Sequence, residues 1–334
     1  MSKRIVVGIL ADTANGFHED TRMGFLGGAE YSQATLLNER PDDIDIVYCP
    51  PDKKPTVANY DAFLLFNCTR YDSRWTRILK ERPFAKRIAD WWRYGDPVLR
   101  RFILDETRLL YFSSYVHKRH FDYANRLPAS SIADMRAVKI VPPPMKLQPF
   151  LDAARNTQPG SRAGALWAGR ICPPKGLQRS IDYALIYGFP LDVYGFRHSE
   201  DIDFESLQNM TVSQARLLLE DFLGALSEKE FADMPLISYK GVYRYADAPH
   251  VFSQYRNFLY HPFWIEPFGR TVIEAYMAGC EMNCDWSKLG CREIMVPTAR
   301  NSLSARGFAE PASIIEIMNA APGKFWGAFL EAIQ

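Results

Sequence analysis

The chain has 334 residues, of which 47% are apolar and 24% charged, and its formal net charge is +1. This is ordinary globular composition with material for two domains of about 150 residues each, and no apolar run approaches the roughly 18 residues that cross a bilayer. Six cysteines without regular spacing predict reduced thiols in a cytoplasm. Cys280, Cys284 and Cys291 are close in sequence but lack a CxxC pair or a partner histidine, which favours a core role over a zinc site.

In the first half of the chain, short apolar runs alternate with helical patterns, which predicts a parallel sheet with crossover helices. Two glycines precede an amphipathic helix over 29–37. Pro142–Pro144 ends the last strand, because proline cannot donate a ladder hydrogen bond. The predicted strands are residues 4–10, 44–48, 62–66, 109–113 and 138–141.

The second half repeats the alternating pattern after a polar stretch, 153–163, which is the best candidate for a domain linker. We therefore expect two doubly wound α/β domains, 1–155 and 156–317, which bind ligand in the cleft between them. A C-terminal helix over 312–333 is expected to be broken at Pro322–Gly323. The other expected elements are strands at 164–168, 191–194, 236–239 and 258–260, helices at 177–187 and 270–277, and a polar insertion at 198–234.

Charge is unevenly distributed along the chain. Between Arg70 and Arg126 the net charge is +7, which leaves −6 for the rest, and the same stretch holds twelve aromatic residues, including Trp91–Trp92. A basic and aromatic surface of this kind attracts an anionic partner such as DNA, an acidic glycan or a lipid headgroup. Amphipathic helices with solvated basic faces are an equally good interpretation of this segment.

The most specific local pattern is Glu266-Pro-Phe-Gly-Arg-Thr-Val-Ile-Glu274, which follows a predicted strand and enters a predicted helix. Gly269 stands where the loop becomes the helix, and a helix N-terminus presents free N–H groups and a positive dipole end to a diphosphate. Glu274 lies about one turn into the helix, where its carboxylate would accept both hydroxyls of a ribose. Glu266, in the preceding loop, would meet a sugar.

Two further patterns place cations and glycines where strands end. Arg170 and Lys175 follow the first strand of the second domain, where they would clamp a diphosphate leaving group. The alternative is two solvated cations on a loop. Gly27 and Gly28 open a helix of the first domain, and glycine lets a backbone approach phosphate or sugar closely.

Together, in this order and separation, these patterns resemble the retaining GT-B glycosyltransferases, specifically the large family four, over most of the chain. The resemblance implies two Rossmann-like domains that face each other across a cleft. The matching segments are 27–30 (GGAE), 112–114 (FSS), 140–144 (IVPPP), 169–170 (GR) with 175–176 (KG), 193–195 (VYG), 239–241 (YKG) and 266–274.

The resemblance also implies roles for individual residues. Arg170 and Lys175 would neutralise the donor diphosphate, and Glu274 would hold the ribose. Glu266 and the backbone amides after it would contact the transferred sugar, and the loop after Gly241 would line the base pocket. A C-terminal helix over about 318–334 would return to the first domain. The implied catalytic set is Glu266, Asp90, Arg170 and Lys175, and the implied donor-binding set is Gly27, Gly28, Arg170, Lys175, Gly241, Val242, Glu266, Pro267, Phe268, Gly269, Arg270, Thr271 and Glu274.

The chain departs from the family pattern in two places. The family often has a His-Asp pair at the end of a first-domain strand, and here the matching Ala89-Asp90-Trp91 keeps the Asp but lacks the His. After Cys280 the sequence continues with a segment, 281–286, that is more polar than the usual apolar strand. The candidate acceptor contacts are Trp91, Trp92 and His117.

Two Asp-x-Asp pairs, Asp43–Asp45 and Asp201–Asp203, are typical of the metal site in the other glycosyltransferase architecture. Asp43 and Asp45 lie at the start of a predicted strand, far from the inferred cleft, and Asp201 lies in the polar insertion. Because Arg170, Lys175 and the helix dipole supply positive charge, we expect no metal and no cofactor, with the nucleotide sugar as co-substrate.

The resemblance thus implies a retaining, metal-independent hexosyltransferase with a nucleotide-sugar donor such as UDP-glucose, which we expect in the cytoplasm. No carboxylate is clearly placed as a covalent nucleophile, so transfer on the same face of the sugar fits better. Three acceptor classes stay open: a glycan or small molecule, a hydroxymethylated base in DNA as in phage, and a lipid-linked acceptor at a membrane surface. A non-catalytic sugar-nucleotide-binding protein of the same fold is the alternative from a different class, because the expected histidine is missing.

Overall fold

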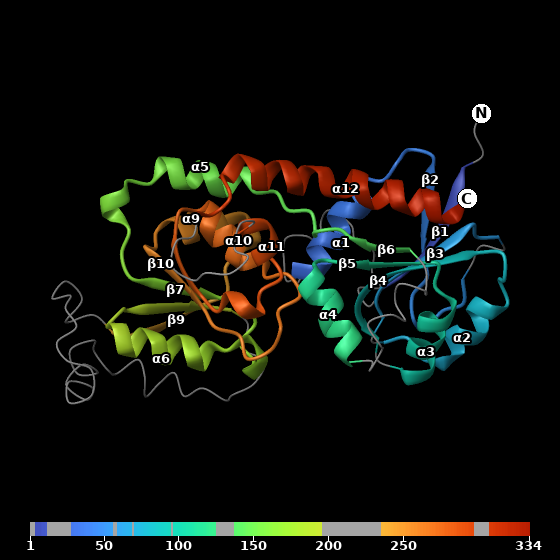
Figure 1. The fold of residues 1–334 in the computed structure, drawn as a ribbon, viewed down its shortest axis with the longest axis horizontal. Coiled ribbons are helices and arrows are strands. Elements are labelled where there is room, and N and C mark those ends of the chain that lie inside the picture. The colour runs from blue at the N-terminus through green and yellow to red at the C-terminus, as the bar shows by residue number, and fades with distance from the viewer. Residues whose placement is uncertain are drawn as a thin grey trace. The chain divides into compact units, whose positions relative to one another are not determined.

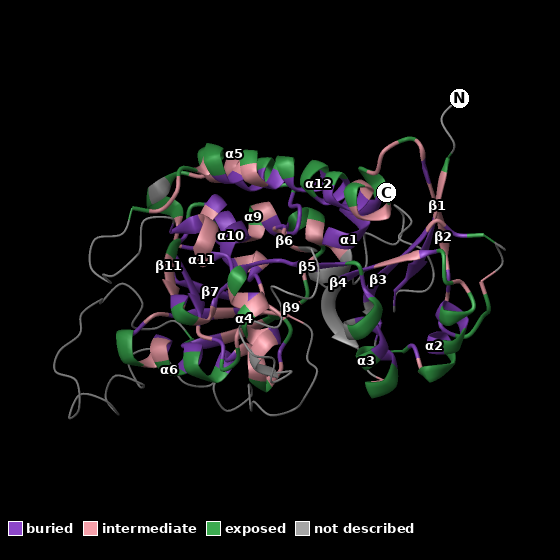
Figure 2. Ribbon diagram, turned by 45° about the vertical axis from the view of Figure 1, so that its right-hand side comes forward, coloured by how far each residue is buried: buried purple, intermediate pink, exposed green. Residues whose placement is uncertain are grey.

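A computed structural model of the chain describes residues 4–11, 28–55, 59–68, 70–94, 96–124, 137–195, 235–296 and 307–334. The chain forms two compact α/β units (Figure 1). Unit 1 comprises residues 1–145 and 316–334, and unit 2 comprises residues 146–315. In both units the strands are mostly buried and the helices turn polar faces outward (Figure 2).

Unit 1 is built on a six-stranded parallel sheet with the strand order β2-β1-β3-β4-β5-β6. Its strands are β1 (Ile5–Leu10), β2 (Ile44–Tyr48), β3 (Ala62–Cys68), β4 (Lys86–Tyr94), β5 (Leu109–Phe112) and β6 (Ala137–Ile140). Its helices are α1 (Gly28–Asn38), α2 (Ser73–Lys80), α3 (Pro97–Glu106), α4 (Tyr115–Ala124) and most of α12 (Pro311–Ile333).

Alternate residues of these strands build two separate cores, because successive side chains of a strand point to opposite faces. On one face, Ile9 and Leu64 pack with apolar residues of α1 and α12. On the other face, Phe63 and Leu65 pack with α2, α3 and α4. Both faces of the sheet are therefore covered, as a parallel sheet requires.

Helix α12 runs continuously through Pro322, so the predicted break at Pro322–Gly323 is wrong. A proline inside a helix costs about 3 kcal/mol. Three side chains on the following turns, Phe325, Trp326 and Phe329, are at most 2% exposed, and each such burial contributes about 1.5–3 kcal/mol. The packing thus outweighs the local cost of the proline.

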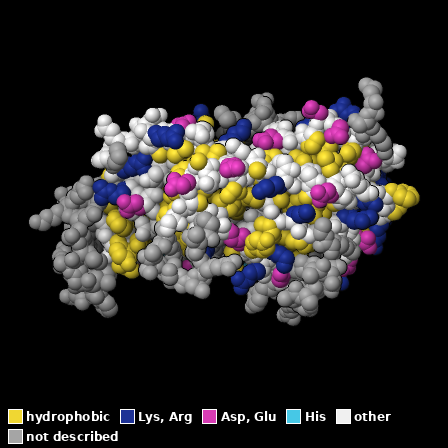
Figure 3. All heavy atoms as spheres, turned by 45° about the horizontal axis from the view of Figure 1, so that its top comes forward, with side chains coloured by type: hydrophobic (Ala, Val, Ile, Leu, Met, Phe, Trp, Pro, Cys, Tyr) yellow, Lys and Arg dark blue, Asp and Glu magenta, His cyan; other side chains and the backbone are white. Residues whose placement is uncertain are grey.

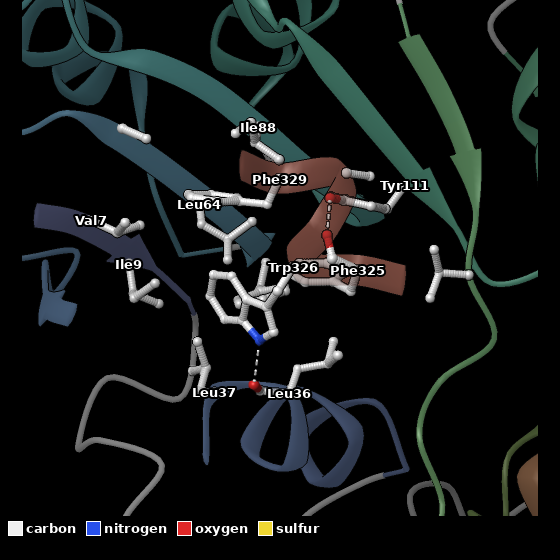
Figure 4. Close-up of a cluster of buried hydrophobic side chains, with 14 of the residues drawn as sticks. Val7, Ile9, Leu36, Leu37, Leu64, Ile88, Tyr111, Phe325, Trp326 and Phe329 are labelled. Carbon is white, nitrogen blue, oxygen red and sulfur yellow. Dashed lines mark hydrogen bonds between the residues drawn. The ribbon is translucent and has the colours of Figure 1, made fainter. Parts of the chain in front are cut away.

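Two hydrogen bonds fix α12 in place (Figure 4). The indole Nε1 of Trp326 donates to the Leu36 carbonyl of α1 at 2.9 Å. The Tyr111 hydroxyl of β5 donates to the Phe325 carbonyl at 2.7 Å, and the two rings stack with centroids 4.2 Å apart. The C-terminal segment is therefore an integral part of the first core.

We expect Trp326→Ala to destabilise unit 1 by about 3–5 kcal/mol, because it opens a cavity and leaves the Leu36 carbonyl without its donor. Urea unfolding followed by tryptophan-independent circular dichroism measures this. Lys324→Ala, an exposed position on the same helix, is the control and should change stability by less than about 0.5 kcal/mol. Equal effects of the two substitutions would show that α12 is not packed as described.

Unit 2 is built on a five-stranded parallel sheet with the order β11-β10-β7-β8-β9. Its strands are β7 (Ala165–Ala168), β8 (Leu191–Tyr194), β9 (Ile237–Gly241), β10 (Asn257–Tyr260) and β11 (Glu281–Cys284). Its helices are α5 (Gln148–Asn156), α6 (Leu177–Tyr187), α9 (Ala248–Ser253), α10 (Arg270–Met277) and α11 (Arg292–Met295). Residues 153–156 of the stretch considered as a linker belong to α5, which packs against α9.

The polar segment 281–286 contains an edge strand of this sheet. In β11, Asn283 donates through Nδ2 to Asn257 Oδ1 of β10 at 3.0 Å and accepts from the Tyr183 hydroxyl of α6 at 3.1 Å. Polar residues are tolerated here because an edge strand is half-covered and their groups are hydrogen-bonded. The segment keeps the parallel order of the sheet without an apolar sequence.

No helix in the part of the chain that the structure describes has the length and hydropathy needed to cross a bilayer.

Candidate functional site

The strand order of unit 2 reverses between β7 and β10. From β7 the chain proceeds to β8 and β9 on one side, and then returns to place β10 and β11 on the other side. In open parallel sheets, ligands bind outside the carboxyl ends of the strands at such a switch point. The loop after β7, with Arg170 and Lys175, and the loop after β10, with Glu266, both start at this edge.

A salt bridge joins these two loops. The Lys175 ammonium contacts Glu266 Oε2, and the Tyr260 hydroxyl, at the end of β10, donates to the same oxygen at 3.1 Å. The Glu266 side chain is 11% exposed and that of Lys175 is 21% exposed. Burial, with the nearby carboxylate second, raises the pKa of Tyr260 well above its usual value, so the phenol stays protonated and keeps donating. The result is a half-buried ammonium with its tip at the switch point.

Glycine at position 176 is what lets the two loops approach. Gly176 has φ of 69°, and a Cβ there would lie 2.0 Å from the His261 carbonyl oxygen. The loop after β10 is fixed from its other side, where Lys288 donates to the carbonyls of Pro262 and Phe263 at 3.1 and 3.0 Å. The Lys-Gly pair of the sequence therefore combines a cation with the only residue type that fits next to it.

We expect Gly176→Ala to destabilise unit 2 by at least about 1–3 kcal/mol, because the new methyl group meets a backbone carbonyl and φ is positive. Gly160→Ala is the matched control, since no atom lies within 4 Å of its added Cβ, and it should leave stability within about 0.5 kcal/mol. Thermal and urea unfolding of both variants measure the difference. A Gly176→Ala variant as stable as Gly160→Ala would contradict the described approach of the loops.

A second carboxylate of the pattern, Glu274, lies in the first turns of α10. The helix starts after Gly269, whose φ of 86° turns the loop into the helix. Glu274 is 3% exposed, and its Oε1 accepts from the Tyr245 hydroxyl at 2.9 Å and lies 3.4 Å from the Arg270 guanidinium. Arg270 also donates to the Tyr245 oxygen at 3.1 Å. Three side chains thus form one closed hydrogen-bonded cluster.

The remaining donor-site candidates of unit 2 are distributed around these loops. Arg170 is exposed two residues after β7. Gly241, with φ of 80°, ends β9, and Val242 after it is 50% exposed. Phe268 is 1% exposed and packs inward. Pro267 and Thr271 are half-buried next to Gly269.

The candidates of unit 1 are described only in part. Gly27 lies outside the described residues, and Gly28 is the first residue of α1. Asp90, Trp91 and Trp92 lie on β4, where the Asp90 backbone pairs with Phe66 and Tyr111, and their side chains lie outside what the structure describes.

His117, in the first turn of α4, is 3% exposed. Its Nδ1 lies 3.0 Å from the Ser113 hydroxyl oxygen, and the ring meets Phe112 edge-on. Burial lowers the pKa of His117 from 6.5 to about 3, so the ring is neutral at physiological pH. As a buried neutral ring it supplies no positive charge to an anionic acceptor.

The basic segment between Arg70 and Arg126 folds into both strands and helices. Many of its described cations have partners nearby: ion pairs join Arg74 to Asp72, Arg77 to Glu81, Arg101 to Asp105 and Lys118 to Asp122, and Lys80 and Arg87 lie over the Phe102 ring. On the face of the molecule shown in Figure 3, basic and acidic side chains are interspersed. Among the described residues, no three His, Cys, Asp or Glu side chains gather in a way that could hold a metal ion.

Several solved structures have a similar fold. HepE from Anabaena, solved with UDP and glucose, is 14% identical, with 99% of this chain and 92% of that chain covered and a TM-score of 0.55. The trehalose-6-phosphate synthase OtsA is 10% identical over 99% and 98% of the chains, with a TM-score of 0.56. A glycosyltransferase from Rickettsia africae ESF-5 is 13% identical over 100% and 96%, with a TM-score of 0.52. The chain has the GT-B fold. No protein-family model matches the chain, and no curated protein sequence does.

Within this GT-B fold, sequence reasoning missed two tyrosines of the candidate site. Tyr260 donates to Glu266 and Tyr245 donates to Glu274. Tyr260 ends a predicted strand six residues before Glu266, so its position at the strand end was a usable signal. Tyr245 lies 29 residues before Glu274 and comes from another loop, so only the folded chain brings the two together.

Proposed function

We propose that the chain is a retaining, metal-independent glycosyltransferase that moves a hexose from a nucleotide-sugar donor to an acceptor hydroxyl. The observation that carries the proposal is the pair of buried carboxylates, Glu266 and Glu274, each with its own cation, at the switch point of a parallel sheet. Structures of the same fold support it, because HepE is known in complex with UDP and with UDP-glucose. A UDP-sugar is therefore the first donor to test.

The proposed chemistry needs positive charge where the donor diphosphate leaves. The bond between the anomeric carbon and the β-phosphate oxygen breaks, and the acceptor oxygen forms a new bond to that carbon. The acceptor proton passes to the departing diphosphate oxygen. Lys175, with Arg170 and the N-terminal end of α10, would stabilise the negative charge that develops on the diphosphate.

Retention of configuration is proposed from the resemblance to the retaining GT-B glycosyltransferases, and the site favours a retaining route without a covalent intermediate. The Glu266 carboxylate is held by the Lys175 ammonium and the Tyr260 hydroxyl, which makes it a poor nucleophile. Transfer on the same face of the sugar requires no covalent intermediate with the protein. Glu266 would then orient the sugar and stabilise its positive charge as the bond breaks.

For the acceptor, we propose a glycan or small molecule in preference to DNA or a lipid headgroup. A glycan or small molecule is the acceptor class that the resemblance to this glycosyltransferase family implies, whereas the segment between Arg70 and Arg126 has a net charge of +7 after its own carboxylates are counted, which a polyanion could use. If the protein binds DNA or anionic vesicles with an affinity that falls steeply as the salt concentration rises, an anionic acceptor would be preferred to a glycan or small molecule.

We expect one nucleotide sugar among UDP-, GDP-, ADP- and TDP-sugars to raise the melting temperature of the protein by the same amount with EDTA and with added Mg²⁺. Glu274→Ala should abolish this shift, and Lys175→Ala should lower turnover of the donor at least about tenfold, or roughly 1.4 kcal/mol. Lys146→Ala, an exposed lysine of unit 2, is the control and should behave as the wild type.

The outcomes distinguish a metal-independent glycosyltransferase from a metal-dependent one and from a non-catalytic binding protein. Binding that EDTA abolishes would overturn metal independence. Binding without any transfer or hydrolysis would favour a non-catalytic sugar-nucleotide-binding protein. If no nucleotide sugar shifts the melting temperature, the proposed function is wrong and only the fold remains.

A separate expectation concerns Glu266. Because its carboxylate neutralises Lys175, Glu266→Gln should free the ammonium and tighten binding of the free nucleoside diphosphate by about 3–10-fold, while turnover falls. Isothermal titration and a transfer assay on the same preparation measure the two effects. Weaker diphosphate binding in Glu266→Gln would show that Lys175 does not exchange Glu266 for the phosphate.

A further inference from the structure

The arginine after Gly269, the cation of the Glu274 pair, takes no part in the bond-breaking step proposed above, yet its side chain is among the least exposed cations that the structure describes. The Arg270 side chain is 9% exposed, and its Nη2 lies 3.4 Å from Glu274 Oε1. Its guanidinium carbon lies 5.7 Å from the centre of the Tyr245 ring. A cation so enclosed is held by its partners and is poorly placed to follow a mobile ligand.

The two carboxylates of the site differ in how their cations are placed. Lys175 reaches Glu266 from another loop and its side chain is 21% exposed, so a ligand can draw it away. Arg270 reaches Glu274 from the preceding turn of the same helix, where helical spacing keeps the two side chains together. The first pair can exchange partners, whereas the second is a fixed support.

The support acts on one oxygen of the carboxylate. Within the described residues, the hydrogen bonds to the Glu274 carboxylate end on Oε1, from the Tyr245 hydroxyl and the Arg270 guanidinium. A carboxylate has about four lone-pair sites, so Oε2 retains its capacity to accept. Holding Oε1 from two directions fixes the plane of the carboxylate and therefore the direction in which Oε2 points.

We propose that Arg270 and Tyr245 are positioning residues that aim Glu274 Oε2 at the ribose hydroxyls of the donor, and so restrict the donor to ribonucleotides. This inference rests on the proposed function, because it requires a nucleotide next to Glu274. A site built to accept a hydrogen bond from a hydroxyl discriminates against the analogue that lacks it, since the buried carboxylate oxygen is then left unpaired. Donors with a 2′-deoxyribose, such as TDP-sugars, are accordingly poor ligands.

The test compares matched ribose and deoxyribose nucleotides by isothermal titration, using UDP with dUDP, GDP with dGDP, and ADP with dADP. The wild type should bind the ribonucleotide of its preferred pair at least about tenfold more tightly. Glu274→Ala should bring this ratio close to one. Arg270→Met and Tyr245→Phe should each reduce the ratio to below about threefold.

Two controls separate positioning from a general loss of structure. Arg155→Met makes the same chemical change at an exposed arginine of α5 and should keep the wild-type ratio. Arg270→Lys keeps the charge, and it should recover part of the ratio that Arg270→Met loses. Damage to the fold alone would weaken both members of a pair equally and leave their ratio unchanged.

The proposal is overturned if Glu274→Ala removes the discrimination while Arg270→Met and Tyr245→Phe retain it. It is also overturned if the wild type binds ribose and deoxyribose forms equally well. A wild type that binds none of the six nucleotides contradicts the proposed function itself, which is a distinct result.

Discussion

Burial of two carboxylates at one edge of the second sheet is the constraint on which the candidate site depends. As whole residues, Glu266 and Glu274 are 8% and 3% exposed to solvent. An uncompensated buried charge costs several kcal/mol. Each carboxylate therefore has a cation and a tyrosine hydroxyl, although the partners come from different elements. Lys175 reaches Glu266 only because the loop after β7 lies close to the loop after β10. That close approach in turn requires glycine at position 176.

The same constraint explains why the site is stiff in one part and adaptable in another. Both partners of Glu274, Tyr245 and Arg270, also bond to each other, so loss of one disturbs the other two. The Lys175 contact has no such closure, and its ammonium lies only 5.7 Å from the centre of the exposed Trp264 ring. A negatively charged ligand can therefore compete for Lys175 without dismantling the helix that carries Glu274.

Much of the fold could be predicted from the sequence, because buried parallel strands have apolar sequences and the loops between them are rich in glycine and proline. The prediction failed where packing overrides local preference. Strand β11 is polar because it lies at the sheet edge and pairs its amides, and α12 passes through Pro322 because Phe325 and Trp326 are buried in the first core. The two glutamates were proposed from the whole string 266–274 between a predicted strand and a predicted helix, but that string carries no information on Tyr245, which only tertiary contact brings to Glu274.

Three candidate bases among the described side chains are poorly suited to take the proton of an acceptor hydroxyl under the proposed function. His117 follows the end of β5, but burial holds its pKa near 3, so it takes up a proton poorly at neutral pH. Glu266 is ion-paired with Lys175, and Glu274 is enclosed by Arg270 and Tyr245. By contrast, the diphosphate oxygen gains negative charge as the glycosidic bond breaks and lies next to the attacking hydroxyl in a same-face transfer. Under the proposed function, the departing diphosphate is therefore a better base than these three side chains, because its negative charge develops as the acceptor loses its proton. The cations that stabilise the diphosphate also lower its basicity.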